Sequence, residues 1–219
     1  MPNKNTCKLS KMTRQLRLYY LLYLHTTGER RTDNPKDLML ELQITSRRML
    51  ERDFKDIRDS GLLNAKYDRK DERYYFEEAS LDKTVEGPRK AHLLKLFRLG
   101  TLISKLSMTD YFDIECYEDA LKEYQDKKTE MKVHPPTSPE EREEMKKELE
   151  NAKESVNDWA EILREHNLVK EYYEHCPESN ERTRQRDFKE IDSIPNFHLY
   201  YDKRVRNHIY YVYDDIYFS

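Results

Sequence analysis

The sequence of 219 residues contains an internal repeat. Residues 52–57 read RDFKDI and residues 186–191 read RDFKEI, so the two copies lie 134 positions apart. The match extends into the flanks, where Tyr67 aligns with Tyr201, and a Tyr-rich hairpin pattern follows each copy. Because a repeated segment sets the architecture of a chain, we predict two units of similar build joined by a middle segment.

The first copy lies within a pattern of three helices and a hairpin. Thr45 or Ser46 can cap the third helix, and Gly61 stands where a left-handed C-cap is expected. Two alternating segments with Tyr and Phe then flank the polar turn of residues 68–71. The pattern predicts a winged helix-turn-helix with helices over residues 11–27, 36–42 and 46–60 and strands over residues 62–67 and 72–77.

The middle of the chain is also predicted to be helical. Residues 90–108 are apolar on several faces, which is typical of a helix that is buried or lies at an interface. Residues 110–128 favour another helix, rich in Tyr and acidic side chains. Residues 131–139 contain three prolines and no periodic pattern, so we interpret them as a linker. Ser138 and Pro139 then form the start of a long helix.

This long helix carries an apolar stripe with spacings of four and three residues. An a/d-type stripe over nearly three heptads packs either against a helix of the same chain or against a second copy of the chain. The sequence leaves both arrangements open, and we predict a homodimer formed through residues 90–165. The stripe consists of Met145, Leu149, Ala152, Val156, Trp159 and Leu163.

Together these patterns predict a mainly α-helical fold with small β-hairpins as wings, in which two winged helix-turn-helix units are joined by a helical middle segment. The presence of only 4 glycines agrees with a mostly helical chain. We place a DNA-binding domain at residues 1–80 and a helical linker and dimerisation segment at residues 81–137. Residues 138–219 contain the long helix and the second winged-helix unit.

The repeated helix combines an apolar face with a basic face. Leu50, Phe54 and Ile57 share the apolar face at helical spacing. Attraction to phosphates supplies affinity for a duplex, while the start of such a helix can enter the major groove. One basic face alone is usual for a solvated surface helix, but the same stripe in both copies favours DNA binding. The stripes are Arg48, Arg52 and Lys55 in the first copy and Arg182, Arg186 and Lys189 in the second.

We therefore predict that the protein binds double-stranded DNA, with the wing of residues 66–74 on the backbone. Asp53 and Asp187, which follow arginines of the stripes, are expected to orient an arginine or the wing as structural partners. The candidate contacts come from the two repeated helices and the two basic turns, and they are Ser46, Arg47, Arg48, Met49, Arg52, Lys55, Arg69, Lys70, Arg182, Thr183, Arg186, Lys189, Lys203, Arg204 and Arg206.

The first unit resembles the winged helix-turn-helix of DeoR-type and WYL-domain bacterial transcription regulators. Their pattern Ser-x-Arg-Thr-Val-x-Arg-Asp-Leu-x-x-Leu corresponds to residues 46–57, with Met49 in place of the Thr. The second copy departs from the pattern, because Arg184 occupies a core aliphatic position and no Gly follows the helix. The resemblance implies a sequence-specific transcription regulator whose helix 46–60 reads the major groove. The Trp-Tyr-Leu sensor motif of that family is absent, so no small-molecule effector is assigned.

Charge is distributed unevenly along the chain. The formal net charge of −3 divides into +6 for residues 1–75, −7 for residues 76–165 and −2 for residues 166–219. Opposed charge blocks indicate different partners for different segments. We interpret the basic first segment as the main DNA contact and the acidic middle as an interaction segment.

The sequence favours neither catalysis nor metal binding. The seven histidines lack metal-ligand spacing, and there is neither a Gly-x-Ser-x-Gly elbow nor a Gly-rich phosphate loop. We therefore expect no enzymatic activity, no metal and no cofactor. Cys7, Cys116 and Cys176 are scattered, and neither a signal peptide nor a membrane span is evident. These features predict a protein of the bacterial cytoplasm without a membrane partner.

Two other functions stay open. Winged helices also serve as protein-interaction modules, and the acidic middle together with Arg184 suits a scaffold. Plasmid-type replication initiators also contain two tandem winged helices, and they should bind short direct repeats as monomers. A dimeric regulator prefers inverted repeats, so the orientation of the half-sites distinguishes these two functions.

Overall fold

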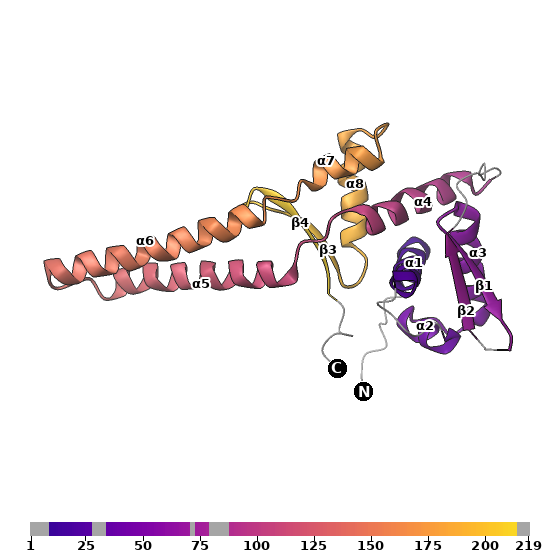
Figure 1. Ribbon diagram of the computed structural model, residues 1–219, viewed down its shortest axis with the longest axis horizontal. Coiled ribbons are helices and arrows are strands. Elements are labelled where there is room, and N and C mark those ends of the chain that lie inside the picture. Colours follow the sequence, from indigo (N-terminus) through magenta and orange to yellow (C-terminus); the bar gives the residue numbers. More distant parts are fainter. Residues whose placement is uncertain (1–8, 28–33, 71–72, 79–87, 214–219) are drawn as a thin grey trace. The chain divides into compact units, whose positions relative to one another are not determined.

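A computed structural model of the protein describes residues 9–27, 34–70, 73–78 and 88–213. In this part the chain is mainly helical with two small β-hairpins (Figure 1). The helices are α1 (Lys11–Thr27), α2 (Pro35–Glu41), α3 (Arg47–Ser60), α4 (Lys90–Lys105), α5 (Tyr111–Val133), α6 (Pro139–Ile162), α7 (Leu168–His175) and α8 (Glu181–Asp192). The strands are β1 (Leu63–Asp68), β2 (Arg73–Glu78), β3 (Phe197–Asp202) and β4 (Asn207–Val212).

Local signals set most of the boundaries. α3 ends at Gly61, whose φ of 88° is the predicted left-handed C-cap. α6 begins at Pro139, and the Ser138 hydroxyl oxygen accepts a hydrogen bond from the Glu141 amide at 3.1 Å. These prolines, glycines and caps act on their own neighbours, so the sequence alone predicts where such helices start and stop.

The linker predicted at residues 131–139 is wrong at its start, because α5 continues to Val133. No helix-breaking residue stands between the predicted end at 128 and Val133, and the first proline is Pro135. The connection to α6 is therefore short, and α5 and α6 follow each other as a helical hairpin. The predicted helix over residues 90–108 is likewise shorter, since α4 ends at Lys105.

The chain divides into two compact units that do not follow the order of the sequence. The core unit contains residues 1–106 and 172–197, and the arm unit contains residues 107–171 and 198–219. α7 crosses this division, and its residues from Tyr172 onward belong to the core unit. Helix α8 also lies in the core unit, whereas nearly all of the hairpin after it belongs to the arm unit.

Within the core unit, α1, α3 and α4 pack around a leucine-rich core. A close approach shapes this packing, because a Cβ placed on Gly100 of α4 would lie 2.5 Å from a methyl carbon of Leu62. Only glycine at position 100 admits the leucine side chain that follows α3 without displacing it. The fully buried side chains of this core include Leu16, Leu18, Leu50, Ile57, Leu96 and Leu99.

The first hairpin packs against its own helix. Strands β1 and β2 pair antiparallel, with Leu63 opposite Glu78 and Asp68 opposite Arg73. The ring of Phe54 on α3 lies 4.2 Å, between centroids, from the ring of Tyr74 on β2. Aromatic pairs at this distance add to the area that they bury, so α3 and its hairpin form one packed element.

In the arm unit, α5 and α6 lie side by side (Figure 1). One end of this helix pair is joined to the second hairpin through a buried apolar cluster. Part of the α6 stripe lies in this cluster. That part packs within its own chain, which is one of the two arrangements that the sequence left open. The homodimer through residues 90–165 stays a prediction. The cluster contains Ile114, Tyr117, Ala160, Leu163, Val205 and Ile209, with Val156 and Trp159 packed against it.

None of the helices among the described residues is both long enough and apolar enough to cross a membrane.

Candidate nucleic-acid interface

Helix α3 separates its two faces as predicted. Leu50, Phe54 and Ile57 are buried in the core unit, whereas Arg48, Arg52 and Lys55 are all exposed. In the part of the chain that the structure describes, no carboxylate pairs with any of these three cations. Unpaired cations on a rigid helix face suit binding to phosphate oxygens, because no internal ion pair has to be broken first.

The start of α3 is open to a ligand. Ser46, Arg47 and Met49 are all exposed, and the Ser46 side chain makes no capping hydrogen bond to the helix. Arg47 leans toward the wing, where its guanidinium carbon lies 4.9 Å from the ring centroid of Tyr67. A hydrogen bond with Tyr67 raises the pKa of Arg47 above its ordinary value. The contact connects the first turn of α3 to strand β1.

The turn of the first hairpin carries two of the predicted contacts. Arg69 and Lys70 are exposed in the turn after β1, and the Lys70 amide donates to the Asp68 carboxylate at 2.7 Å. This local hydrogen bond stabilises the turn, as aspartate often does at such positions. The last part of the predicted wing turn, residues 71 and 72, lies outside the described residues.

Asp53 has the structural role that the sequence predicts. Its carboxylate is buried and accepts two hydrogen bonds from the Arg14 guanidinium of α1, at 2.5 and 3.1 Å. Gln15 donates a third hydrogen bond at 3.0 Å. Such a two-point pair fixes orientation as well as distance. It sets the angle at which α3 presents its basic face relative to α1.

One turn further along α3, Asp56 forms a second group of ion pairs. Lys11 lies 2.7 Å from its carboxylate, Gln15 donates at 2.8 Å, and Arg89 also pairs with it. Burial by itself raises the pKa of Asp56, but hydrogen bonds from Lys11 and Gln15 outweigh it and lower the pKa below its ordinary value. His92 lies nearby and bonds Gln15 at 2.8 Å.

The same frame of ion pairs recurs in the second copy. Arg98 of α4 donates to Asp187 of α8 at 2.8 and 2.9 Å, and Lys95 lies 2.8 Å from Glu190. Each basic residue stands 84 positions after its counterpart in α1, whereas each acid stands 134 positions after its counterpart in α3. We infer that α4 is the counterpart of α1, and that the α5–α6 hairpin is inserted between the first and second helices of the second copy.

Tyr172 of α7 completes this frame from a third helix. Its buried hydroxyl donates to Asp187 at 2.8 Å, and its ring meets that of Phe188 edge-on at 5.6 Å. Burial raises the pKa of Tyr172 to about 12, so the hydroxyl keeps its proton at neutral pH. The hydrogen bond of Arg98 with Asp187 also raises the pKa of that arginine.

Helix α8 exposes the predicted basic stripe but differs at its start. Arg182, Arg186 and Lys189 are exposed, while Thr183 is half-buried and its amide bonds the N-cap Asn180 at 2.9 Å. The N-cap side chain of α8 therefore makes a hydrogen bond to its helix, whereas the N-cap side chain of α3 makes none.

Arg184, which stands at the aligned position of Leu50, is the least favourable residue of α8. Its side chain is buried, and its guanidinium carbon lies 5.2 Å from the Phe188 ring centroid. Its Nε and Nη1 atoms are buried without a hydrogen-bond partner among the described residues. The third nitrogen, Nη2, lies 3.9 Å from the Glu181 carboxylate, but two buried nitrogen atoms without a partner are costly. We infer that the hydrogen bonds of Asp187 with Arg98 and Tyr172 help to hold α8 in place and offset the cost of Arg184.

The second basic turn is not brought together with α8 in one unit. Lys203, Arg204 and Arg206 are exposed in the turn between β3 and β4, which belongs to the arm unit. The Asp202 carboxylate accepts from the Arg204 amide at 2.7 Å and so fixes this turn. The first copy thus holds its helix and its hairpin in one compact unit, and the second copy does not.

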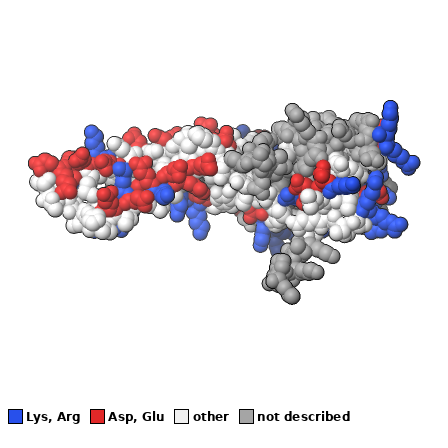
Figure 2. All heavy atoms as spheres, turned by 90° about the horizontal axis from the view of Figure 1, so that it is seen from below, with Lys and Arg blue, Asp and Glu red and all other residues white. Residues whose placement is uncertain are grey.

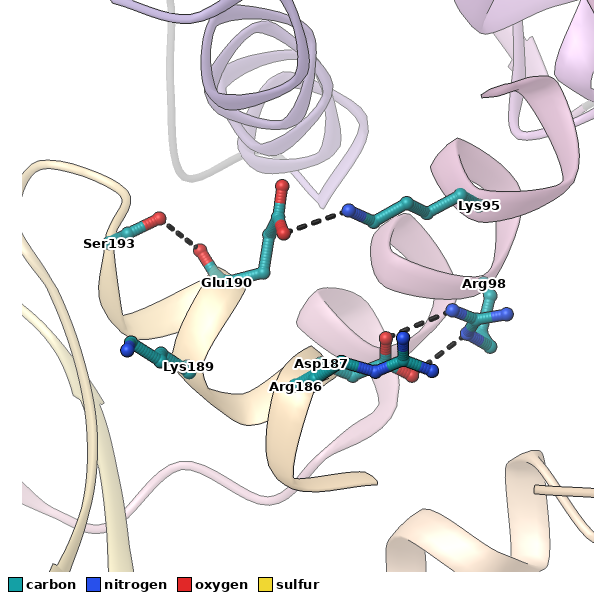
Figure 3. Close-up of a pocket in the computed structure, with 7 residues that line it drawn as sticks. All are labelled: Lys95, Arg98, Arg186, Asp187, Lys189, Glu190 and Ser193. Atoms are coloured by element: carbon teal, nitrogen blue, oxygen red, sulfur yellow. Dashed lines mark hydrogen bonds and ion pairs between the residues drawn. The ribbon is translucent and has the colours of Figure 1, made fainter. Parts of the chain in front are cut away.

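A hollow of about 410 Å³ lies between α4 and α8 in the core unit (Figure 3). Two of its lining residues, Arg186 and Lys189, are predicted from the sequence as candidate contacts, but their neighbours on α4 are not. No sequence signal links α4 to α8, because the pairing residues lie 89 and 95 positions apart. The lining consists of Lys95, Arg98, Arg186, Asp187, Lys189, Glu190 and Ser193.

Acidic side chains gather on α5 and α6 on the face seen in Figure 2. Among the described residues no cluster of three or more His, Cys, Asp or Glu side chains is arranged to hold a metal ion.

No model of a protein family matches the chain, and neither curated proteins nor solved structures include one that is significantly similar to it.

Proposed function

We propose that the protein binds double-stranded DNA sequence-specifically and regulates transcription in a bacterial cytoplasm, with α3 as the helix that enters the major groove. The observation that carries this proposal is the exposed stripe of Arg48, Arg52 and Lys55, which has no carboxylate partner in the described part of the chain. The opposite face of α3 is buried in the core unit, so the stripe is presented on a fixed support.

The residues divide into two roles on this proposal. Arg48, Arg52 and Lys55 attract phosphates, which supplies affinity and salt dependence. Ser46 and Met49, at the open start of α3, lie where the N-terminal turn of a recognition helix meets base edges. Arg69 and Lys70 of the wing lie on the backbone and fix the register.

The buried pair of Arg14 with Asp53 supports this mode of binding because it fixes α3 on the side opposite its basic stripe. It holds α3 by its buried face, so DNA contacts do not have to order the helix. Preorganised contacts lose less side-chain and backbone entropy on binding. The proposal therefore treats Arg14, Gln15 and Asp53 as positioning residues and not as DNA contacts.

The test is duplex binding by the full chain at several salt concentrations, after a random-duplex selection has identified a site. Arg48→Ala and Arg52→Ala should each reduce the slope of log affinity against log salt by about one for each phosphate that the arginine neutralises. Lys147→Ala, which removes an exposed cation of α6, serves as the matched control and should leave the slope unchanged. Absence of duplex binding at low salt by the full chain would overturn the proposal and favour a scaffold.

A second candidate is a tandem-module protein of the replication-initiator kind. The duplicated ion-pair frame favours it, because one chain then holds two helices of the same build, α3 and α8. Such a protein binds two direct half-sites as a monomer, whereas the regulator binds inverted half-sites as a dimer. The same selection, combined with the mass of the complex in solution, separates the two candidates.

A further inference from the structure

The hollow between α4 and α8 is rich in positive charge. Four cationic side chains line it, against the two carboxylates of Asp187 and Glu190. Each carboxylate already pairs with a cation of α4, namely Arg98 and Lys95 (Figure 3). The lining thus has two more cations than carboxylates.

The surplus cations both belong to α8. The Arg186 guanidinium donates to the neutral Thr183 hydroxyl at 3.4 Å, which leaves its charge uncompensated. For the Lys189 ammonium, no hydrogen bond or ion pair occurs among the residues that the structure describes. Both side chains are exposed at the hollow, where an incoming anion can reach them without displacing a carboxylate.

The first copy differs from the second at the position of Ser193. Ser193 of the hollow aligns with Asp59 of the first copy, which pairs with Arg89 at 3.0 Å. The first copy therefore has a third carboxylate at this position and the second copy has a neutral hydroxyl. Arg186 and Lys189 are retained from Arg52 and Lys55. Because Arg89 neutralises Asp59 in the first copy, the second copy keeps the same surplus of two cations with one acid and one arginine fewer.

We propose that this hollow binds a phosphate group. Arg186 offers a planar fork that matches two phosphate oxygens, and Lys189 adds a point charge from one turn further along α8. Lys95 and Arg98 stay paired with their carboxylates and supply the surrounding field. At about 410 Å³ the hollow has room for a phosphate and for part of the molecule that carries it.

Two sources can supply such a group. A diffusing phosphorylated molecule, such as a nucleotide, requires nothing of the DNA-binding proposal. A backbone phosphate of bound DNA is the other source, and that version rests on the proposed function. Both sources share the same recognition chemistry, and competition between them tells them apart.

The experiment measures binding of pyrophosphate to the full chain by calorimetry at low salt. Replacing both surplus cations (Arg186→Gln with Lys189→Gln) should weaken binding by at least about tenfold, the factor for removal of one charge-assisted hydrogen bond. The matched control is Arg142→Gln with Lys146→Gln, which removes an exposed arginine and an exposed lysine one turn apart on α6 and should leave pyrophosphate affinity unchanged. All four side chains are exposed, so both variants should keep the fold, as circular dichroism would verify.

Equal weakening by both pairs, no weakening by the α8 pair, or no binding of pyrophosphate at millimolar concentration overturns the proposal. A selected duplex is then added to the pyrophosphate complex. Displacement of pyrophosphate by the duplex identifies the backbone source, and simultaneous binding identifies a small phosphorylated ligand. Pyrophosphate binding by a chain that binds no duplex would overturn the DNA-binding proposal and leave this one standing.

Discussion

The two repeated helices are held by matching ion pairs with an earlier helix, but the hairpins that follow them pack differently. In each copy a lysine and an arginine, three residues apart on an earlier helix, pair with two acids three residues apart on the repeated helix. In the first copy the hairpin returns to its own helix, where Tyr74 meets Phe54. In the second copy the hairpin supplies Val205 and Ile209 to the arm unit instead.

The difference teaches that the helix pair is the constant part of this architecture and that the packing of the hairpin is the variable part. α8 keeps the two ion pairs with α4 and buries Phe188 and Ile191, although Arg184 occupies a core position and the hairpin packs in the arm unit. The first copy has the additional contacts that hold its helix and its hairpin in one compact unit. A substitution in one copy can therefore be judged against the aligned position of the other.

The largest effect is expected from removing the buried acids of the ion-pair frame. Asp53→Ala should lower the free energy of unfolding by about 3–5 kcal/mol, because it leaves the mostly buried Arg14 without its partner. Asp187→Ala should cost less, about 1–3 kcal/mol, since Arg98 is 33% exposed and water can solvate it. Urea unfolding of both variants measures the difference.

Glu144→Ala, at an exposed position of α6, is the control and should stay within about 0.5 kcal/mol of the parent. Equal losses for Asp53→Ala and Asp187→Ala would show that the burial of the arginine does not decide the cost.

A smaller effect of opposite sign is expected at Arg184. Replacement by leucine, the residue at the aligned position 50, removes two buried nitrogen atoms that have no hydrogen-bond partner among the described residues. Arg184→Leu should therefore stabilise the core unit by about 1–3 kcal/mol in thermal or urea unfolding. Arg182→Leu, at an exposed position of the same helix, should change stability by less than about 0.5 kcal/mol. A destabilised Arg184→Leu variant would mean that the guanidinium is satisfied in solution.

A smaller loss of stability is expected from removing the contact between α3 and the first hairpin. Arg47→Ala removes the cation–π contact with Tyr67 and should cost about 0.5–1 kcal/mol at this exposed site. Glu181 stands at the aligned position of α8, so the second copy lacks such a contact. Arg48→Ala is the neighbouring control, and a loss as large as that of Arg47→Ala would contradict a specific contact with the ring.

The smallest effect is the pH dependence that His92 and Asp56 give to the stability of the first copy. Burial lowers the pKa of His92, so as pH falls through 6.5 the unfolded chain takes up the proton first and stability falls. The pKa of Asp56 is lowered by hydrogen bonds from Lys11 and Gln15, although burial opposes them, so its contribution is complete above 3.8 and is lost below it.

Urea unfolding between pH 7 and pH 3 should therefore show two successive declines in stability. The variant His92→Gln should remove the upper decline and keep the lower one. An unchanged upper decline in this variant would assign it to another group.

The sequence predicts those parts of the fold whose causes are local. The helix over residues 11–27, the left-handed Gly61 and the start at Pro139 all follow from neighbours in the chain. The structural role of Asp53 is also predictable, because a buried acid on a helix face requires a partner. Its partner Arg14 is not, since any of several cations in the first helix could approach it.

The sequence does not reveal which helix supports the second copy. The repeat is visible in α3 and α8, but α1 and α4 share little besides a lysine and an arginine three residues apart. The inserted hairpin also shifts their spacing from 134 to 84 positions, so an alignment with one offset misses them. The hollow between α4 and α8 depends on that pairing and is therefore missed as well.

The insertion also has a consequence for how the chain reaches its native state during synthesis. The Arg14–Asp53 pair closes a loop of 39 residues, whereas the Arg98–Asp187 pair closes one of 89 residues. The longer closure costs only about 0.7 kcal/mol more in chain entropy. It does delay completion, because α4 must wait for residues 107–171 of the arm unit to emerge from the ribosome before α8 arrives. The first copy can thus form while the second is still being translated, and a nascent chain interrupted before α8 would still contain every element of the first.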